Sequence, residues 1–159
     1  DVVEVIGRYN LSYVTGAQFL FTDRTGASLV VAPGLSGELE FVRTDLPFEA
    51  VANSNEVTFP QSLPYDRRHR TAVAELQRIA DGDVALSVES FAEILAKLAF
   101  TEGPSETSYS NVFDLTNGVL YLYAWHDFDH SLVLDIDTLL AVTKQEVYEI
   151  DALFAEGGS

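Results

Sequence analysis

The densest pattern in the chain is a pair of β-rich runs that flank an Asn-Gly step. The first run spans residues 107–115 and the second spans 119–125, with Thr116-Asn117-Gly118 between them. Asn and Gly both tolerate the positive φ that a type I′ turn requires, so this arrangement is a strong short-range signal for a β-hairpin. The pattern therefore commits this part of the chain to antiparallel sheet.

Further strands are predicted on both sides of this hairpin. A β-rich run at 17–23, the turn residues Arg24-Thr25-Gly26 and the run 27–31 predict a second hairpin. Residues 38–43 alternate acidic and apolar side chains, as on a half-buried strand. A short strand is predicted over 48–53 and another over 131–136, whereas 54–64 contains two prolines and is predicted to be a surface loop.

Helical periodicity appears in further stretches. Residues 1–9 show helical spacing of apolar side chains, although Val3 and Val5 leave a strand open. An apolar stripe over 72–80 predicts a helix that stops at Gly82, and Ser87 has the residue type of an N-cap for a helix over 88–98. Apolar positions from 139 to 154 predict a C-terminal helix. The order of elements predicts an α+β fold of antiparallel sheets with packed helices, in a single domain over 1–159.

Composition excludes several classes of protein. The 159 residues contain 9 Lys+Arg and 25 Asp+Glu, for a net charge of −16, yet 47% of them are hydrophobic, which excludes a disordered acidic tail. The only basic cluster is Arg67, Arg68 and Arg70, so no nucleic-acid partner is expected. No apolar run approaches the ~18 residues of a membrane helix, so no membrane contact is expected. The acidity favours a salt-rich or extracellular setting without identifying a compartment.

The absence of cysteine limits the chemistry that these residues can perform. With no Cys in the chain, disulfides, Cys-ligated zinc and a Cys nucleophile are excluded within it. The chain also lacks methionine, including at position 1, which fits a processed or excised polypeptide. The sequence contains neither a nucleophile elbow nor a phosphate-binding loop.

The basic cluster at 67–70 opens a predicted helix, where a guanidinium opposes the helix dipole. One interpretation is ion pairing with the abundant carboxylates of the surface. The other is a guanidinium of Arg67 or Arg70 that points into a pocket and binds an anionic group or holds a catalytic carboxylate.

Two other polar clusters also have two interpretations each. Asn53, Ser54 and Asn55 lie where a predicted strand gives way to a loop, and amide side chains commonly cap turns there. The Asn53 amide could instead donate to a developing oxyanion. The segment 126–130 and the nearby Asp135 and Asp137 contain possible metal ligands. Their spacing suits a solvated turn better, so no metal and no cofactor is expected.

The run from Thr107 to Gly118, continued by Leu120-Tyr121-Leu122-Tyr123 and His126-Asp127-Phe128, resembles the C-terminal hairpin of the linear-amide C–N hydrolases. These are N-terminal-nucleophile (Ntn) enzymes related to choloylglycine hydrolase, penicillin V acylase and the penicillin acyltransferase-like proteins. The hairpin at 19–26, the Ala52-Asn53 step, and the helix start at 67–72 followed by 87–100 are similar and come in the same order. The resemblance covers about residues 1–142.

The resemblance implies an αββα sandwich, of which this chain would be the C-terminal portion. It implies that Asn53 is the oxyanion donor and Arg67 the catalytic arginine at the helix start, with Arg70 as the alternative to Arg67. Arg70 and Asn55 are in addition predicted to bind the substrate. In the family, the nucleophile is a cysteine at the N-terminus of the chain.

Three functions are therefore compatible with this chain. The first is the C-terminal part of a hydrolase or acyltransferase that acts on a small-molecule amide, with the nucleophile cysteine in a missing segment or a second polypeptide. The alternative is a binding or structural module that retains the fold without catalysis, and a third is a metal-binding domain. Bare sheet edges and apolar faces of a partial sandwich predict a heteromer or self-association.

Overall fold

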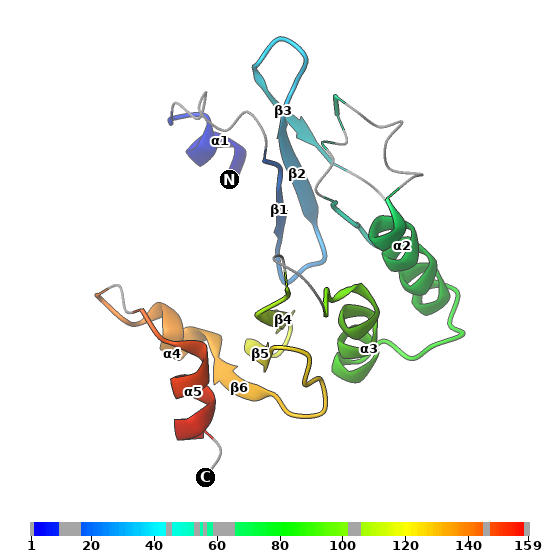
Figure 1. The fold of residues 1–159 in the computed structure, drawn as a ribbon. Helices are drawn as coiled ribbons and strands as arrows, with labels where there is room; N and C mark the ends of the chain where they lie inside the picture. Colours follow the sequence, from blue (N-terminus) through cyan, green and yellow to red (C-terminus); the bar gives the residue numbers. More distant parts are fainter. Residues whose placement is uncertain are drawn as a thin grey trace. The chain divides into compact units, whose positions relative to one another are not determined.

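The computed structural model describes residues 2–9, 17–43, 46–52, 55, 57–58, 66–101, 106–144 and 147–157 (Figure 1). These residues form two compact units, 1–83 and 84–159, and each is described by itself. The chain is a mixed α+β protein with two three-stranded antiparallel sheets, which confirms the predicted class. The prediction of one domain over 1–159 stays a prediction.

The first unit contains an antiparallel sheet in the order β1 (Phe19–Thr22), β2 (Ser28–Pro33) and β3 (Leu39–Val42). The predicted hairpin is confirmed, with Phe19 opposite Val31 and Thr22 opposite Ser28. The Asp23 carboxylate closes its turn by accepting the Thr25 and Ala27 N–H groups. The central strand is the most buried part of the unit, since residues 29–32 are at most 5% exposed.

The helices of this unit are α1 (Val2–Ile6) and α2 (Arg67–Ala80). Residues 2–6 are therefore helical, whereas the sequence was compatible with either a helix or a strand there. The strand predicted over 48–53 is wrong for its described part, because residues 48–52 have no strand pairing. The Ala52 carbonyl accepts a hydrogen bond from the Gln18 side chain, so a side chain takes the place of a ladder bond at this carbonyl.

The second unit contains the antiparallel sheet β4 (Tyr109–Asp114), β5 (Val119–Ala124) and β6 (Leu132–Asp135), in that order. Helix α3 (Val88–Leu98) packs against β4, and its start is fixed by a reciprocal capping box of Ser87 and Ser90. Ala92 of α3 meets Val112 and Tyr123 in the core of the unit. The partly buried side chains around this core are Val88, Phe91, Leu95, Tyr121 and Phe128.

The β4–β5 hairpin is confirmed, but its predicted turn type is wrong. The strands end at Asp114 and resume at Val119, so four residues form the connection. Only Gly118 takes a positive φ there, of 70°, whereas a type I′ turn would require one at Asn117 as well. The physical reason is the Asp114 carboxylate, which accepts hydrogen bonds from both the backbone N–H and the side-chain amide of Asn117.

The predicted C-terminal helix is also corrected, because its described residues form two helices, α4 (Ile136–Leu140) and α5 (Ile150–Gly157). After α4 come Val142 and Thr143, whose β-branched side chains have low helix propensity. Helix α5 contacts β5, and the Trp125 indole N–H donates to the Asp151 carboxylate at 3.1 Å. No helix among the described residues is long and apolar enough to cross a membrane.

The positive φ at Gly118 generates a test of the hairpin turn. An added Cβ would meet no atom within 4 Å, so backbone strain alone should decide the effect of a substitution. We expect Gly118→Ala to lower the free energy of unfolding by about 1 kcal/mol. Gly118→Asn should cost less, because Asn tolerates this region better. Chemical denaturation followed by Trp125 fluorescence measures both, and equal stability of the wild type and the Ala variant would contradict the turn geometry.

The turn carboxylate generates a second test, on the pH dependence of folding. Hydrogen bonds from the side chain and backbone of Asn117 lower the pKa of Asp114. A carboxylate whose pKa is lower in the folded state stabilises the protein above its unfolded pKa, and this stabilisation is lost as the pH falls through the folded pKa. Asp114→Asn should therefore be less stable than the wild type at neutral pH, and the difference should shrink on acidification. Urea titrations of the two proteins from neutral to acidic pH measure the difference in stability, and a difference that does not change with pH would contradict this role of Asp114.

Candidate functional site

The basic cluster lies in the first turn of α2, where Asp66 is the N-cap. Its carboxylate accepts the backbone N–H groups of Arg68 at 2.9 Å and His69 at 3.1 Å. A capping carboxylate also offsets the positive end of the helix dipole. Asp66 therefore compensates for the unfavourable position of three arginines at a helix start.

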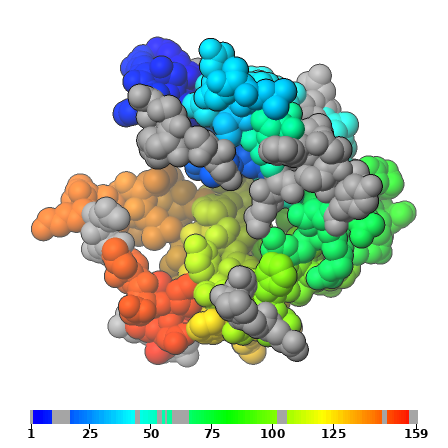
Figure 2. All heavy atoms as spheres, turned by 45° about the horizontal axis from the view of Figure 1, so that its top comes forward, coloured from blue at the N-terminus to red at the C-terminus, as the bar shows by residue number. Residues whose placement is uncertain are grey.

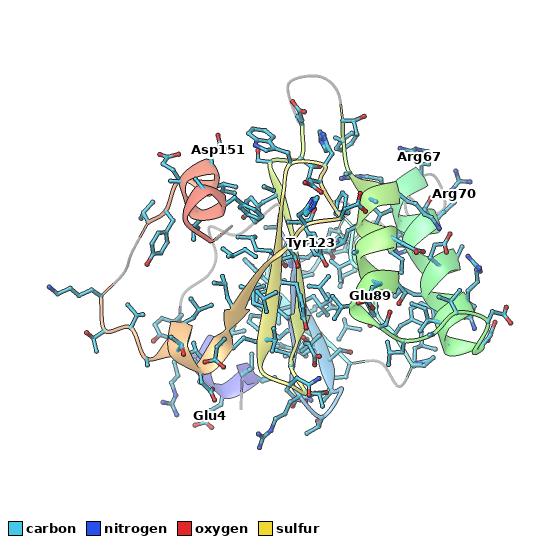
Figure 3. The ribbon with its side chains drawn as sticks, turned by 90° about the horizontal axis from the view of Figure 1, so that it is seen from below. Glu4, Arg67, Arg70, Glu89, Tyr123 and Asp151 are labelled. Atoms are coloured by element: carbon cyan, nitrogen blue, oxygen red, sulfur yellow. The ribbon has the colours of Figure 1, made fainter. Side chains whose placement is uncertain are left out.

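One face of α2 forms a shallow depression of about 310 Å³. Its lining residues follow the helical spacing of one face: Arg67, Arg70, Thr71, Ala74 and Glu75. Figure 3 shows the two labelled arginines near the beginning of the helix, and the atoms of α2 lie at the surface in Figure 2, where they are green. The depression combines two guanidinium groups and a hydroxyl with one carboxylate.

We call the polar residues of this depression (Arg67, Arg70, Thr71 and Glu75) the arginine face. They differ in the hydrogen bonds and ion pairs that they form. The Thr71 hydroxyl donates to the Arg67 backbone carbonyl at 2.9 Å, and Glu75 pairs with Arg78 at 2.8 Å. Within the described ranges, the guanidinium groups of Arg67 and Arg70 form no ion pair. Their donors can therefore serve a small anion, for which a planar guanidinium is well suited.

Asn53 lies outside the described residues, whereas Ala52 and Asn55 each form a hydrogen bond with the region of the first sheet. Gln18, just before β1, donates to the Ala52 carbonyl, and Asn55 donates to the Pro33 carbonyl at 2.9 Å. The start of β1 and the end of β2 lie at the same end of the sheet, because the two strands are antiparallel. Ala52 and Asn55 are therefore both anchored at one end of the first sheet.

Asn55 caps a turn with its own side chain. Its carbonyl oxygen accepts the N–H groups of Val57 at 2.9 Å and Thr58 at 3.0 Å, while its amide nitrogen donates to Pro33. This is the turn chemistry that amide side chains favour. Among the described residues, one amide hydrogen of Asn55 has no acceptor, and the role of Asn55 in substrate binding stays a prediction.

The structure brings Arg67 and Arg70 together on one helix face. It does not join them to Asn53, which is not among the described residues. The predicted pairing of an oxyanion donor with an arginine therefore stays a prediction.

The segment 126–130 forms a hydrogen-bonded turn. The Asp127 carboxylate accepts the N–H groups of Asp129 and His130 and lies 2.9 Å from the His130 Nδ1 atom. His126 uses its Nε2 atom for the Phe100 carbonyl, at 2.8 Å. In the part of the chain that the structure describes, no three His, Asp or Glu side chains are grouped to hold a metal ion.

Two features of the second unit carry no recognisable signal in the sequence. Trp125 has a φ of 50°, which is rare for a bulky residue, directly after β5. Tyr123, on β5, is 4% exposed, and burial raises the pKa of its hydroxyl, which also interacts with Ser131 and with the charge of Glu89 on α3 (Figure 3). An aromatic residue in a strand ordinarily indicates core, so sequence reasoning could not single out either position.

Comparison of the chain with models of known protein families, with curated proteins and with solved structures found no match. The site is therefore defined by its residues and their geometry alone.

The N-cap of α2 generates a test of what positions the arginine face. Asp66→Ala removes the acceptor for two backbone N–H groups and should lower the free energy of unfolding by about 1 kcal/mol. Asp66→Asn keeps a capping oxygen and should stay within a few tenths of a kcal/mol of the wild type. Denaturant titration with far-UV circular dichroism compares the stability of the three proteins. An Ala variant as stable as the Asn variant would contradict the capping of α2 by the Asp66 side chain.

Proposed function

We propose that this chain is the C-terminal part of a hydrolase or acyltransferase that acts on linear amide C–N bonds of small molecules. The nucleophile cysteine would come from a segment outside these 159 residues or from a second polypeptide. The observation that carries the proposal is the arginine face of α2, where Arg67 and Arg70 share one depression in a protein of net charge −16. Two such cations side by side on an acidic chain favour a small anionic ligand over a general surface role.

The finer fold that we propose is the αββα sandwich of the Ntn enzymes. In such a sandwich, each sheet has one face toward helices and one toward the other sheet, so both faces are apolar. The residues of the second sheet fit this requirement, because α3 covers the face with Val112 and Tyr123. The pairing register places the following apolar side chains on the opposite face: Tyr109, Phe113, Leu120, Leu122, Leu132 and Leu134.

The first sheet supports the same architecture. Its register places Phe19, Val31 and Phe41 on one face, together with the ring of Phe21, 6.4 Å from that of Phe19. Val30 and Ala32 lie on the other face and are no more than 3% exposed. A central strand buried on both faces is what a sheet between two other layers requires.

The proposed chemistry assigns a role to each predicted site residue. The cysteine thiolate attacks the amide carbonyl carbon, and the C–N bond breaks as the leaving nitrogen takes up a proton and departs as an amine. The acyl group then passes from sulfur to water or to an acceptor amine, which gives up a proton as the thiolate is restored. The Asn53 amide would donate to the tetrahedral oxyanion, which is where a neutral, fixed donor contributes most. Arg67, as the catalytic arginine, would orient the substrate for attack by holding its carboxylate together with Arg70. Asn55 would donate an amide hydrogen to the substrate.

The absence of cysteine favours a second candidate, a binding module that retains the fold without turnover. Such a module would keep the arginine face and bind the same anionic amide. The two candidates differ in turnover by the complete assembly and agree in the binding that they predict for α2.

Binding to the arginine face can be tested with hippurate, which combines an amide bond with a carboxylate. We expect chemical-shift changes at the backbone amides of α2 on titration with hippurate, and a loss of affinity of about tenfold or more in Arg67→Gln. Arg24→Gln, in the β1–β2 turn, removes the same charge elsewhere and should leave the affinity unchanged. If both variants weaken hippurate binding equally, the effect comes from net charge and the assignment of the site is wrong.

Turnover separates the two candidate functions. The chain is isolated from its natural source, and the copurifying polypeptides are identified by intact mass and N-terminal sequencing. The proposal predicts a polypeptide with an N-terminal cysteine and the release of glycine from hippurate or of an amine from related amides. In that assembly Asn53→Ala should lower kcat by about 10²–10³-fold, as the loss of an oxyanion donor does. An assembly that binds amides without cleaving them would support the binding module.

A further inference from the structure

Strand β4 has an open edge in the described part of the second unit. The sheet order is β4-β5-β6, so β4 pairs only with β5. The Trp125 N–H donates to the Ser108 carbonyl at 2.7 Å, which identifies 108 and 125 as a hydrogen-bonded pair of the ladder. Because such pairs alternate along an antiparallel ladder, the backbone groups of Tyr109, Asn111 and Phe113 point away from β5.

Just before β4, the outward N–H of Thr107 donates to the Phe100 carbonyl at 2.9 Å, so the open part of the edge is β4 itself. Within Tyr109–Asp114 this edge lacks the sequence features that protect sheet edges in other proteins. Natural edge strands are short, carry Lys or Pro, or are bulged. β4 has six residues, against four in each of β1, β3 and β6, and its only charge is Asp114 at its end. Tyr109 and Phe113 are 53% and 54% exposed. The strand is therefore an aromatic edge, uncharged up to its last residue, in a strongly acidic chain.

The sequence of β4 is complementary to itself in the antiparallel direction. If two copies pair about Asn111, Tyr109 of each copy lies opposite Phe113 of the other, and the two Asn111 amides face each other. These three positions are the ones with outward backbone groups, so each pair exchanges both N–H···O bonds. Asp114 then lies opposite the uncharged Ser108, so no two carboxylates meet across the axis.

We propose that β4 is the interface of a symmetric dimer, in which β4 pairs antiparallel with β4 of a second copy about Asn111. The β4-β5-β6 sheets of the two copies then form one continuous sheet across the two-fold axis. Each pair of Tyr109 with Phe113 contributes cross-strand packing. The net charge of −16 on each copy opposes the association, so the dimer strengthens as salt screens this repulsion. This inference does not depend on the proposed function.

Sedimentation velocity of the full chain over a range of concentrations and of NaCl measures the association. The wild type should dimerise more tightly at about 0.5 M than at about 0.05 M salt, values that bracket a Debye length of roughly 10 Å. Phe113→Asp places a carboxylate at the interface and should raise the dimer Kd at least tenfold. Val133→Asp adds the same charge at a position of β6 that is 58% exposed, and should leave the Kd within about threefold. Equal effects of the two variants overturn the proposal.

Cross-linking tests the register independently, and the absence of native cysteine makes it specific. Opposed residues of a hydrogen-bonded pair have Cα atoms about 5.5 Å apart, within the range that a disulfide spans. Asn111→Cys should therefore form a disulfide-linked dimer under mild oxidation, whereas Val133→Cys should form no disulfide-linked dimer under the same conditions. Equal cross-linking of both variants, or a wild-type chain that stays monomeric at every concentration and salt, overturns the dimer. So does an isolated assembly in which a strand of a different polypeptide occupies the β4 edge.

Discussion

Aspartate carboxylates that accept backbone N–H groups are the interaction on which both units depend. They close the β1–β2 and β4–β5 turns, begin α2 and α4, and order the turn after β5. Each fixes the point at which a strand or helix starts, and therefore the register of the next element. The residues that do this are Asp23, Asp66, Asp114, Asp127 and Asp135. Part of the acidity of the chain is therefore structural.

The same carboxylates explain how a basic cluster persists in an acidic chain. The Asp66 carboxylate offsets the positive end of the α2 dipole, next to Arg67 and Arg70. These arginines therefore need no ion-pair partner to lie at the helix start. Their face is then a local positive site within a negative field, which repels polyanions and leaves room for a small anion. The proposed anionic group of the ligand and the expected absence of a nucleic-acid partner both rest on this charge distribution.

Sequence patterns predicted the helices and strands more accurately than the turns and loops that connect them. The hairpins at 19–33 and 109–124 and the helices at 67–80 and 88–98 follow from strong periodicity and turn residues. The turn at Asn117-Gly118 was harder to predict, because a side chain four positions before Gly118 decides its geometry. The strand expected at 48–53 is absent from its described residues, 48–52, and the Ala52 carbonyl accepts instead from Gln18, which is distant in the sequence. For the site, the sequence shows that the arginines are clustered, but that Arg67 and Arg70 share one face follows only from the helix that contains them.

By itself, the sequence determined which segments pair locally, where α2 and α3 begin, and that no cysteine chemistry resides in these residues. Those properties depend on neighbours within a few positions or on composition alone. Only the tertiary structure decided that β2 is buried on both faces, that Trp125 takes a left-handed φ beside α5, and that β4 presents its outward backbone at an edge. These depend on which elements lie next to each other, and packing between distant segments is not encoded in any single stretch of the chain.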